Sequence, residues 1–484
     1  MSEEKNKTML IYPPGDLYQR GEDRCQGNID KSSATSMRAC NDLGYAASVL
    51  LQKGYKVFLK DYQTERLSLE DLLADVRKFE PDLLVLSVTN STIYEDIAVV
   101  NGIMQTYPTV ITLKGAIFFD IDAEMLDLFD LSNVDFLLGG EIELSIGKIA
   151  DFALRNKGSW RDIPNIFYKE TNGVFQKTAF GIWEQDLDSI PFPARLLMNN
   201  KLYTRPDTGE AMATIQTSRG CSASCIYCLS PQISGKKIRY RSPSNIMAEL
   251  EECYYMHHIR NFFFKADTFT MHSTWVEELC EMIIASPLYK KIFFTANART
   301  HPLNEKTLMT MKKAGCFLVA FGFESGSSET MERIKKGATV EQNLKAAEMA
   351  RKAKLSFYGF YMIGFPWETE YHLNETKKHI LETNPDYLEI HIALPYYGTE
   401  LYKSCLENHT LKKNTWGSNY FDSNITGTCE CDIERLKSFR YEIMKKFYLR
   451  LPYILKKLGA CIKTPKAFPR YVKYGIRLIK NIND

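Results

Sequence analysis

Six short apolar runs between residues 213 and 392 alternate with helical patterns, and this alternation restricts the chain to a parallel β/α architecture. Such runs are typical of strands that are buried on both faces. Six strand–helix units in series predict a parallel barrel or an open part of one. The expected strands are Ala213–Thr217, Asn261–Phe264, Lys291–Thr295, Phe317–Phe321, Ser356–Phe360 and Tyr387–Ile392. The expected helices are Pro243–Tyr255, Trp275–Ala285, Glu305–Ala314, Val340–Lys354 and Tyr371–Glu382.

The first 150 residues show a second alternation of the same kind. Helical patterns such as Leu43–Leu51 and Leu67–Leu73 separate the apolar runs. This order predicts a doubly wound, Rossmann-like parallel sheet, whose ligand is expected at the carboxyl ends of the strands. The expected strands are Met9–Tyr12, Lys56–Leu59, Leu83–Val88, Val110–Leu113 and Val134–Leu138.

The length of 484 residues is too great for one ordinary domain and indicates two or three. Between about residues 155 and 205 the pattern becomes irregular, which predicts a linker with a small antiparallel addition. The expected segments are an α/β domain at 1–155, the linker at 156–205, a partial (β/α)6 TIM-type barrel at 206–405 and a basic helical C-terminal region at 406–484.

The composition, with 45% hydrophobic and 25% charged residues, is typical of soluble globular proteins. No apolar run approaches the roughly 18 residues that a membrane-spanning helix needs, and the first residues lack the apolar core of a signal peptide. We therefore expect a cytoplasmic protein. In that setting the 12 cysteines indicate thiols or metal ligands rather than a disulfide framework.

Three cysteines, Cys221, Cys225 and Cys228, lie in a Gly- and Ser-rich loop directly after the first barrel strand. Three thiolates can hold three corners of a cubane 4Fe-4S cluster and leave the fourth iron open to a small molecule. A zinc site is the main alternative, but structural zinc usually has four ligands in two pairs, and no second pair follows. Three buried structural thiols are a further alternative, although such thiols do not normally gather in a loop of this kind. We favour the cluster.

Unusual polar residues follow each of the other predicted barrel strands at its end. Because the carboxyl ends of parallel strands form one rim, and active sites of such barrels are built there, these residues are expected to converge. They are Lys265 and Asp267, Asn297 and Arg299, Glu324, Gly364 and Glu368, and the run Pro395–Thr399.

The C-x3-C-x2-C spacing, with Tyr227 before the last cysteine, resembles the signature of the radical S-adenosylmethionine superfamily. The likeness extends from Thr217 to about Thr399. It implies a 4Fe-4S cluster that transfers one electron to S-adenosylmethionine and so releases a 5′-deoxyadenosyl radical. It also implies an electron donor such as a flavodoxin or a ferredoxin.

The resemblance implies a role for several of the rim residues. The run around Glu324 resembles the strand whose acidic residue contacts S-adenosylmethionine, and Arg299 could pair with its methionyl carboxylate. The run Ile363–Thr369 resembles the turn near the adenine. One departure is Lys265-Ala-Asp267, where relatives often carry two aspartates, so Asp267 and Lys265 are the catalytic candidates. For Asp267 and Arg299 a structural salt bridge is the alternative. The expected cofactor-binding residues are Tyr227, Asn297, Arg299, Glu324, Gly364 and Glu368.

The N-terminal domain resembles that of the cobalamin-binding subclass, in which a corrinoid lies between the two domains and usually carries a methyl group. The matching features are Pro13–Pro14, Leu43–Ala47, Lys60–Asp61 and Gly139–Glu143. No Asp-x-His-x-x-Gly motif follows the first strand, so histidine ligation of cobalt is not expected. One glycine, Gly115, remains where a pair usually occurs, and Lys114 or Phe118 could fill the pocket. Cobalamin binding therefore stays open, with a scaffold domain as the alternative.

The last 53 residues, 432–484, carry 14 Lys and Arg against 4 Asp and Glu, a net charge of +10 within a chain whose total is +2. Apolar residues from Phe439 to Leu458 recur at helical spacing. We favour a helix that packs over the barrel mouth with a solvated basic face. Peripheral contact with the inner membrane surface is the alternative, and it would favour a lipid-like substrate. Nucleic-acid binding is not expected.

Cys429 and Cys431, with Cys405, could ligate an auxiliary cluster, although free thiols are favoured because no compact set is evident. The resemblance implies a radical enzyme that modifies an unactivated carbon of a small-molecule or lipid-like substrate. Cobalamin-dependent methyl transfer is the reaction that we favour. Radical carbon–carbon coupling, cyclisation or rearrangement without cobalamin is the second possibility. A cobalamin or redox sensor without catalysis is the third.

Overall fold

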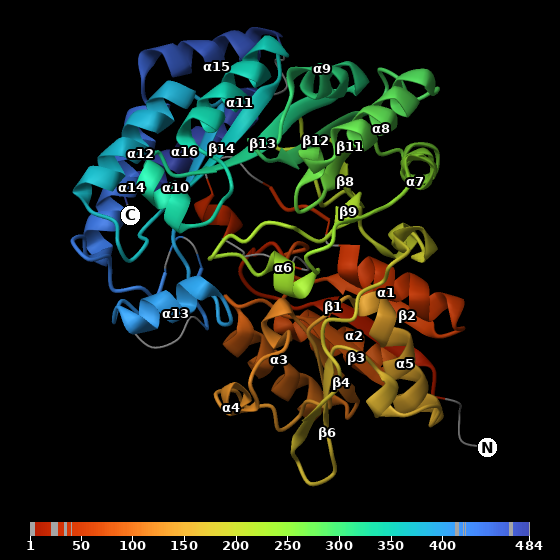
Figure 1. The fold of residues 1–484 in the computed structure, drawn as a ribbon. Coiled ribbons are helices and arrows are strands. Elements are labelled where there is room, and N and C mark those ends of the chain that lie inside the picture. Colours follow the sequence, from red (N-terminus) through yellow and green to blue (C-terminus); the bar gives the residue numbers. More distant parts are fainter. Residues whose placement is uncertain are drawn as a thin grey trace.

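The computed structural model describes residues 5–20, 28–32, 36–39, 41–411, 416–419, 421, 423–463 and 468–483. An N-terminal α/β unit, red to yellow in Figure 1, packs against a barrel-like unit drawn in green to cyan. The C-terminal helices, in blue, lie beside the barrel (Figure 1). No helix within these described ranges is long and apolar enough to cross a membrane.

The N-terminal sheet has the strand order β2-β1-β3-β4-β5-β6-β7. Its first five strands are parallel, and β6 and β7 add an antiparallel edge. The order reverses between β1 and β3, which is the switch point where doubly wound sheets bind ligands. The strands are β1 (Lys7–Tyr12), β2 (Lys56–Asp61), β3 (Leu83–Ser87), β4 (Val110–Lys114), β5 (Phe136–Leu138), β6 (Ile166–Lys169) and β7 (Phe175–Lys177).

Helices cover both faces of this sheet, because alternate residues of each strand point to opposite sides. Met9 and Ile11 share a buried cluster with α2 (Leu69–Phe79) and α3 (Ile93–Thr106). Leu10 and Tyr12 pack instead with α1 (Asn41–Gln52) and α5 (Ile142–Arg155). A short helix, α4 (Ala123–Leu126), follows β4. The expected doubly wound sheet is confirmed.

The second unit is a six-stranded, all-parallel sheet with neighbours in chain order, which confirms the partial (β/α)6 barrel. Its strands are β8 (Met212–Gln216), β11 (Asn261–Lys265), β12 (Phe293–Ala298), β13 (Cys316–Glu324), β14 (Ser356–Ile363) and β15 (Tyr387–Ile392). Its longer helices are α7 (Pro243–Tyr255), α8 (Ser273–Ala285), α9 (Glu305–Ala314), α11 (Val340–Lys352) and α12 (Glu370–Thr383). Shorter elements that the sequence pattern did not reveal are the hairpin of β9 (Ser218–Arg219) and β10 (Arg239–Tyr240), with α6 (Ser230–Ile233) and α10 (Ser328–Arg333).

The C-terminal region holds α13 (Glu400–Glu407), α14 (Ile433–Tyr448), α15 (Leu451–Lys463) and α16 (Phe468–Asn483). The single helix expected from Phe439 to Leu458 is wrong, because the chain leaves the helical path after Tyr448 and starts again at Leu451. Pro452 lies in the first turn of α15, where a proline costs no hydrogen bond. The expected position over the barrel mouth is also wrong for α14, which packs on β15 at the sheet edge.

Helix α14 supplies hydrogen-bond partners for backbone groups of β15, the last strand of the described sheet. The outer side of β15 pairs with no further strand of that sheet. The hydroxyl of Tyr448 accepts from the Leu388 N–H and donates to the Leu388 carbonyl, both at 2.8 Å. Nε of Arg440 donates to the Ile390 carbonyl at 2.8 Å. These side chains take the place of a seventh strand and cover an edge that would otherwise invite pairing with another chain.

Replacing Tyr448 by phenylalanine is expected to destabilise the protein by about 1–3 kcal/mol, because a buried N–H and a buried carbonyl lose their partner. Urea unfolding followed by circular dichroism measures this. Tyr441→Phe, on the same helix but half-buried, is the control and should change stability by less than about 0.5 kcal/mol. Equal effects of the two substitutions would show that the hydrogen bonds of Tyr448 to β15 do not stabilise the protein.

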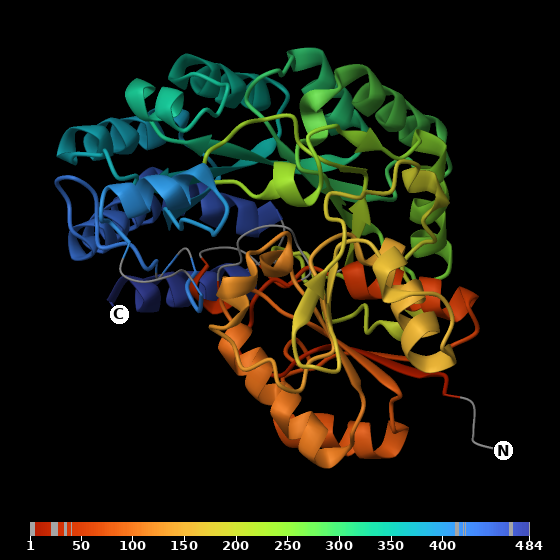
Figure 2. The same cartoon turned by 60° about the horizontal axis from the view of Figure 1, so that its bottom comes forward.

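The N-terminal unit also closes the gap between β8 and β15, the first and last barrel strands. Oγ of Ser32 donates to the Glu389 carboxylate on β15 at 2.9 Å, and Nδ2 of Asn41 donates to the Thr214 carbonyl on β8 at 2.9 Å. The guanidinium of Arg38 lies 4.3 Å from the ring centre of Phe263. Figure 2 shows the C-terminal helices in blue beside both units, and Arg477 of α16 donates to the Ile29 carbonyl at 3.1 Å.

Candidate functional site

The cysteine loop begins where β8 ends and is fixed by backbone contacts. The N–H of Cys221 donates to the Gly235 carbonyl at 3.0 Å, and the N–H of Gly220 donates to the Asp267 carboxylate at 3.1 Å. Gly220 has a φ of +95°, and a Cβ there would lie 2.3 Å from the Lys237 carbonyl oxygen. Only glycine fits this turn, so the loop geometry depends on it.

All three cysteines line one cavity of about 420 Å³ inside the barrel. The cavity exists because β12 and β13 point small groups inward, at Thr295, Ala320 and Gly322, where barrels of this kind usually carry bulky side chains. The structure brings together around it most of the predicted site: Cys221, Cys225, Cys228, Tyr227, Asp267, Asn297, Arg299 and Glu324.

The arrangement of the thiols bears on which metal they suit. In the part of the chain that the structure describes, no three His, Cys, Asp or Glu side chains converge on one ion-sized point, as a zinc ion would require. The ligands of a cubane bind three different irons and need no common point. Burial raises the pKa of the Cys221 thiol, so it must release its proton to become a ligand. Three thiols on one loop are the donor set that a 4Fe-4S cluster with one open iron requires.

Glu324 lies at the cavity wall in a strained backbone conformation. It ends β13 with a φ of +62°, where the pairing register with β14 shifts. Strain of this kind in a non-glycine residue is concentrated at functional sites. The Lys336 ammonium lies 2.5 Å from its carboxylate, and both side chains are buried. Lys336 was not predicted from the sequence, because it lies in a loop without a recognisable pattern.

Arg299 and Asp267 make structural contacts and still line the cavity. Nε of Arg299 donates to the His301 carbonyl at 3.2 Å, and its NH2 group donates to the Lys336 carbonyl. Asp267 orients the start of the cysteine loop through Gly220. Lys265, in contrast, lines a separate space of only about 40 Å³ between the two units. The two catalytic candidates therefore face different spaces.

Gly364 and Glu368 do not line the cavity but form a turn beside it. Oε2 of Glu368 accepts from the N–H groups of Gly364, at 2.7 Å, and Phe365, at 3.1 Å. Oγ1 of Thr330 donates to Oε1 at 3.3 Å. The side chain is fully buried, and this burial raises its pKa to about 7. Glu368 is therefore a positioning residue for the turn at Gly364.

The raised pKa of Glu368 sets a pH dependence of stability. The unfolded carboxyl ionises near its ordinary value of 4.5, whereas the folded one keeps its proton up to about 7. The unfolding free energy is therefore expected to fall by about 3 kcal/mol as the pH rises from 4.5 to 7, relative to Glu368→Gln, which cannot ionise. Urea unfolding of both proteins at pH 5 and pH 8 measures this. A constant difference between them would show that Glu368 is ionised throughout.

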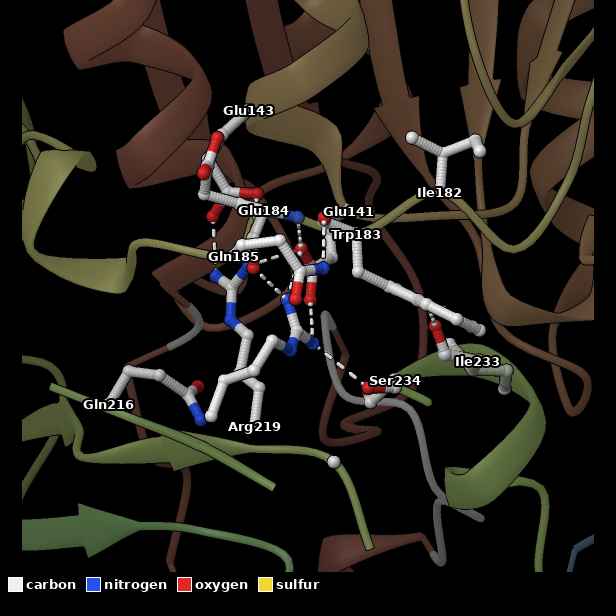
Figure 3. Close-up of polar contacts among 12 residues, drawn as sticks. Glu141, Glu143, Ile182, Trp183, Glu184, Gln185, Gln216, Arg219, Ile233 and Ser234 are labelled. Carbon is white, nitrogen blue, oxygen red and sulfur yellow. Dashed lines mark hydrogen bonds and ion pairs between the residues drawn. The ribbon is translucent and has the colours of Figure 1, made fainter. Parts of the chain in front are cut away.

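An ion-pair network holds the cysteine loop against the N-terminal unit, as Figure 3 shows. Arg219, two residues before Cys221, lies 2.5 Å from the Glu143 carboxylate. Arg239, on the partner strand of the hairpin, lies 2.6 Å from Glu141. The two glutamates open α5, just past the end of β5. The run Gly139–Glu143 was noted in the sequence, but its partner Arg219 was not predicted. The position of Arg219, two residues before Cys221, could have indicated that it holds the cysteine loop.

A second cavity, of about 720 Å³, lies between the two units and adjoins the first at Leu229 and Tyr396, which line both. Its lining is rich in aromatic side chains, which offer flat apolar faces. These aromatic residues are Phe119, Phe180, Trp183, Tyr396, Tyr397 and Trp416.

Side chains fill the space beside Lys114, which is one of the two possibilities that the sequence left open. Phe118 is fully buried, and the Lys114 ammonium lies 3.7 Å from the Asp42 carboxylate. The remaining space of about 40 Å³ holds no more than a few water molecules. A bulky group therefore does not fit beside Lys114.

Cys405, Cys429 and Cys431 remain free thiols in this structure. Sγ of Cys429 donates to the Glu368 carbonyl at 3.6 Å, and Sγ of Cys431 donates to the Glu370 carboxylate at 3.8 Å.

Known proteins resemble this chain in sequence. Residues 215–380 match the family described as the Radical SAM superfamily. The chain is 29% identical over 414 residues to a protein of Pyrococcus horikoshii named Uncharacterized methyltransferase PH0819, covering 86% of this chain and 88% of that protein. It is 24% identical over 364 residues to the hopanoid C-3 methylase of Methylococcus capsulatus, covering 74% and 67%.

Solved structures share the fold. The methyltransferase TsrM from Kitasatospora setae, solved with cobalamin and a [4Fe-4S] cluster bound, has a TM-score of 0.66 at 14% identity, covering 84% of this chain and 76% of its own. OxsB, a cobalamin-dependent S-adenosylmethionine radical enzyme, has a TM-score of 0.64 at 16% identity, covering 92% and 61%. At such identities the likeness establishes the architecture of both units.

Proposed function

We propose that this chain is a radical S-adenosylmethionine enzyme that transfers a methyl group to an unactivated carbon of a small molecule with the help of cobalamin, since residues 215–380 match that superfamily. The observation that carries the proposal is the single cavity lined by Cys221, Cys225 and Cys228 and by the rim residues opposite them. The names of the sequence relatives support methyl transfer as the reaction.

The thiolates of Cys221, Cys225 and Cys228 would hold a 4Fe-4S cluster, which supplies the electron that splits a carbon–sulfur bond of S-adenosylmethionine. Glu324 would accept hydrogen bonds from the ribose or amino group of S-adenosylmethionine, and Lys336 holds its carboxylate in place. Arg299 would bind the methionyl carboxylate. Asn297 and Tyr227 would complete the cavity wall, and the turn at Gly364, which Glu368 holds, would lie beside the adenine.

The aromatic cavity between the units would hold the face of cobalamin, which supplies the methyl group. This cavity shares the wall residues Leu229 and Tyr396 with the barrel cavity, and the substrate carbon would lie near them, between the two cofactors. A flavodoxin or a ferredoxin would supply the electrons.

Anaerobic reconstitution tests the proposal. Protein purified without oxygen should contain iron, sulfide and corrinoid, and after reduction it should form 5′-deoxyadenosine from S-adenosylmethionine. Incubation with a cell extract of small molecules and S-adenosylmethionine carrying a deuterated methyl group should yield a product in which one hydrogen is replaced by that group. Absence of 5′-deoxyadenosine in cluster-loaded protein would contradict the radical function and favour a sensor.

One observation favours a second candidate function, radical coupling or rearrangement without cobalamin. The ion pair of Lys114 and Asp42 fills the sheet position at which the subclass usually admits part of the corrinoid. In that case the reconstituted protein would bind no corrinoid, would still form 5′-deoxyadenosine, and would yield a product that lacks the deuterated group.

We also propose that α15 and α16 bind an anionic membrane surface. No acidic residue occurs between residues 443 and 483, and exposed apolar side chains recur along both helices. Basic and apolar groups on one helix are the features of interfacial binding. Such a position would suit a lipid-like substrate. The exposed apolar residues are Leu451, Ile454, Leu455, Leu458, Ile462, Phe468, Val472 and Ile476.

Vesicle sedimentation measures this contact. The protein is expected to bind phosphatidylserine vesicles but not phosphatidylcholine vesicles, and binding should weaken with salt. The double substitution Leu458→Glu with Ile462→Glu should reduce binding by at least about 10-fold, because it removes two apolar groups and adds two negative charges. Leu406→Glu, on the exposed side of α13, is the control. Equal binding of both vesicle types would contradict the proposal.

A further inference from the structure

The barrel cavity has a second end, away from the cysteines, where β14 and β15 meet the N-terminal segment around Ser32. We propose that this end is the substrate subsite and that it selects a neutral, largely apolar, ring-containing molecule with one hydroxyl or N–H group that donates to Glu389. The inference rests on the proposed function, because it places the substrate in the cavity that the cluster shares.

Glu389 is the polar centre of this end. It points into the cavity from β15 although its side chain is only 3% exposed. Its Oε2 accepts from the Tyr358 hydroxyl at 3.0 Å and from Oγ of Ser32 at 2.9 Å. Both of these donors use Oε2, so the donor group of a ligand would be accepted at Oε1. The bonds hold the carboxylate in one orientation before a ligand arrives.

The charge of Glu389 is balanced from outside the cavity. The guanidinium of Arg440, on α14, lies 3.7 Å from Oε1. Arg440 also packs over the ring of Phe421 at 4.6 Å and is fixed to the Ile390 carbonyl. The pair is neutral as a whole, so Glu389 does not leave an unbalanced negative charge at this end of the cavity.

The walls around the carboxylate are mostly aromatic. Tyr358 and Phe360 stack with ring centres 4.5 Å apart, and His391 lies 5.8 Å from Phe360 and 5.9 Å from Phe421. Burial and then the nearby Arg440 lower the pKa of His391 to about 3, so the imidazole is neutral at ordinary pH. Flat apolar faces around one acceptor suit a ring system, because aromatic rings stack on such faces.

Both units of the protein build the subsite. Ser32 belongs to the N-terminal unit, whereas Tyr358, Phe360 and Glu389 belong to barrel strands. The N-terminal unit therefore contributes directly to substrate selection, besides any cofactor that it holds. Glu389 was not predicted from the sequence, because its neighbours on β15 show only the alternation of a buried strand.

Three probes that share one ring system test the inference. We would measure the binding of 2-naphthol, naphthalene and 2-naphthoate to the full-length, anaerobically reconstituted protein by equilibrium dialysis. 2-Naphthol is expected to bind at least about 10-fold more tightly than either of the others, which corresponds to one hydrogen bond to a charged acceptor. Glu389→Gln should reduce this preference to below about 3-fold. Glu407→Gln, an exposed residue of α13, should leave it unchanged.

Phe360→Leu is a second variant that keeps most of the side-chain volume. It should weaken the binding of all three probes by a similar factor, because it removes a stacking face and leaves the acceptor intact. Equal affinities for the three probes, no binding of any of them, or an unchanged preference in Glu389→Gln would overturn the inference. Formation of 5′-deoxyadenosine by the same preparations reports separately on the proposed function, so the two failures are distinguishable.

Discussion

Replacing Cys225 by alanine is expected to abolish iron–sulfur cluster assembly and to lower 5′-deoxyadenosine formation by more than about 100-fold. Among the described residues three thiols line this cavity, and the loss of Cys225 leaves two of them for a cluster that needs three protein sulfurs. Loss of a residue that only hydrogen-bonds to a metal ligand typically costs 10–100-fold in metal affinity or activity, so loss of a ligand itself should cost more. Iron and sulfide analysis, with chromatography of the nucleoside product, measures both effects.

Cys429→Ser is the matched control, because Cys429 is an exposed free thiol in the same protein. It should leave iron content and 5′-deoxyadenosine formation within experimental error of the parent. If Cys225→Ala kept its iron and its activity, or if Cys429→Ser lost both, the assignment of the cluster to the loop after β8 would be wrong.

Replacing Glu249 by alanine is expected to destabilise the protein by about 3–5 kcal/mol, the largest effect of a single substitution outside the cluster. Glu249, on α7, is completely buried and lies 2.6 Å from the NH2 group of Arg195. It also pairs with Arg241. The two arginines donate to the carbonyls of Thr214 and Gln216, at the end of β8 where the cysteine loop begins. Alanine would leave two buried cations uncompensated.

Anaerobic urea unfolding measures the loss, and Glu251→Ala, exposed on the same helix, is the control that should change stability by less than about 0.5 kcal/mol. Burial alone would raise the pKa of Glu249, but Arg195 and Arg241 hold it below its ordinary value. Its contribution is therefore present at pH values above the ordinary pKa of 4.5 and is lost as the pH falls through the lower folded pKa. A Glu249→Ala protein as stable as the control would show that the two arginines do not depend on this carboxylate.

The strands and longer helices could be predicted from the sequence because their signals are local. The limits of α7 and α9 agree with the expected ranges, since Ser242 and Asn304 cap their first turns and the apolar spacing is regular. The break between α14 and α15 was missed because the apolar spacing continues across it. Pro452 was the available signal for a new helix start.

The candidate site could be predicted where residues follow strand ends, as Asn297, Arg299 and Glu324 do. The residues that hold these side chains in place could not be predicted from the sequence. Lys336 reaches Glu324 from a loop, Glu143 reaches Arg219 from the other unit, and Ser32 reaches Glu389 across most of the chain. Such pairs depend on how the two units pack, and no periodicity in the sequence encodes that packing.

Electron paramagnetic resonance of the reduced, reconstituted protein, recorded before and after addition of S-adenosylmethionine, tests most directly whether three cysteines leave one iron open. We expect the signal of a reduced 4Fe-4S cluster whose g values change when S-adenosylmethionine binds. A signal that does not respond to S-adenosylmethionine, or protein that carries zinc on these cysteines and gives no cluster signal, would contradict the open-iron site.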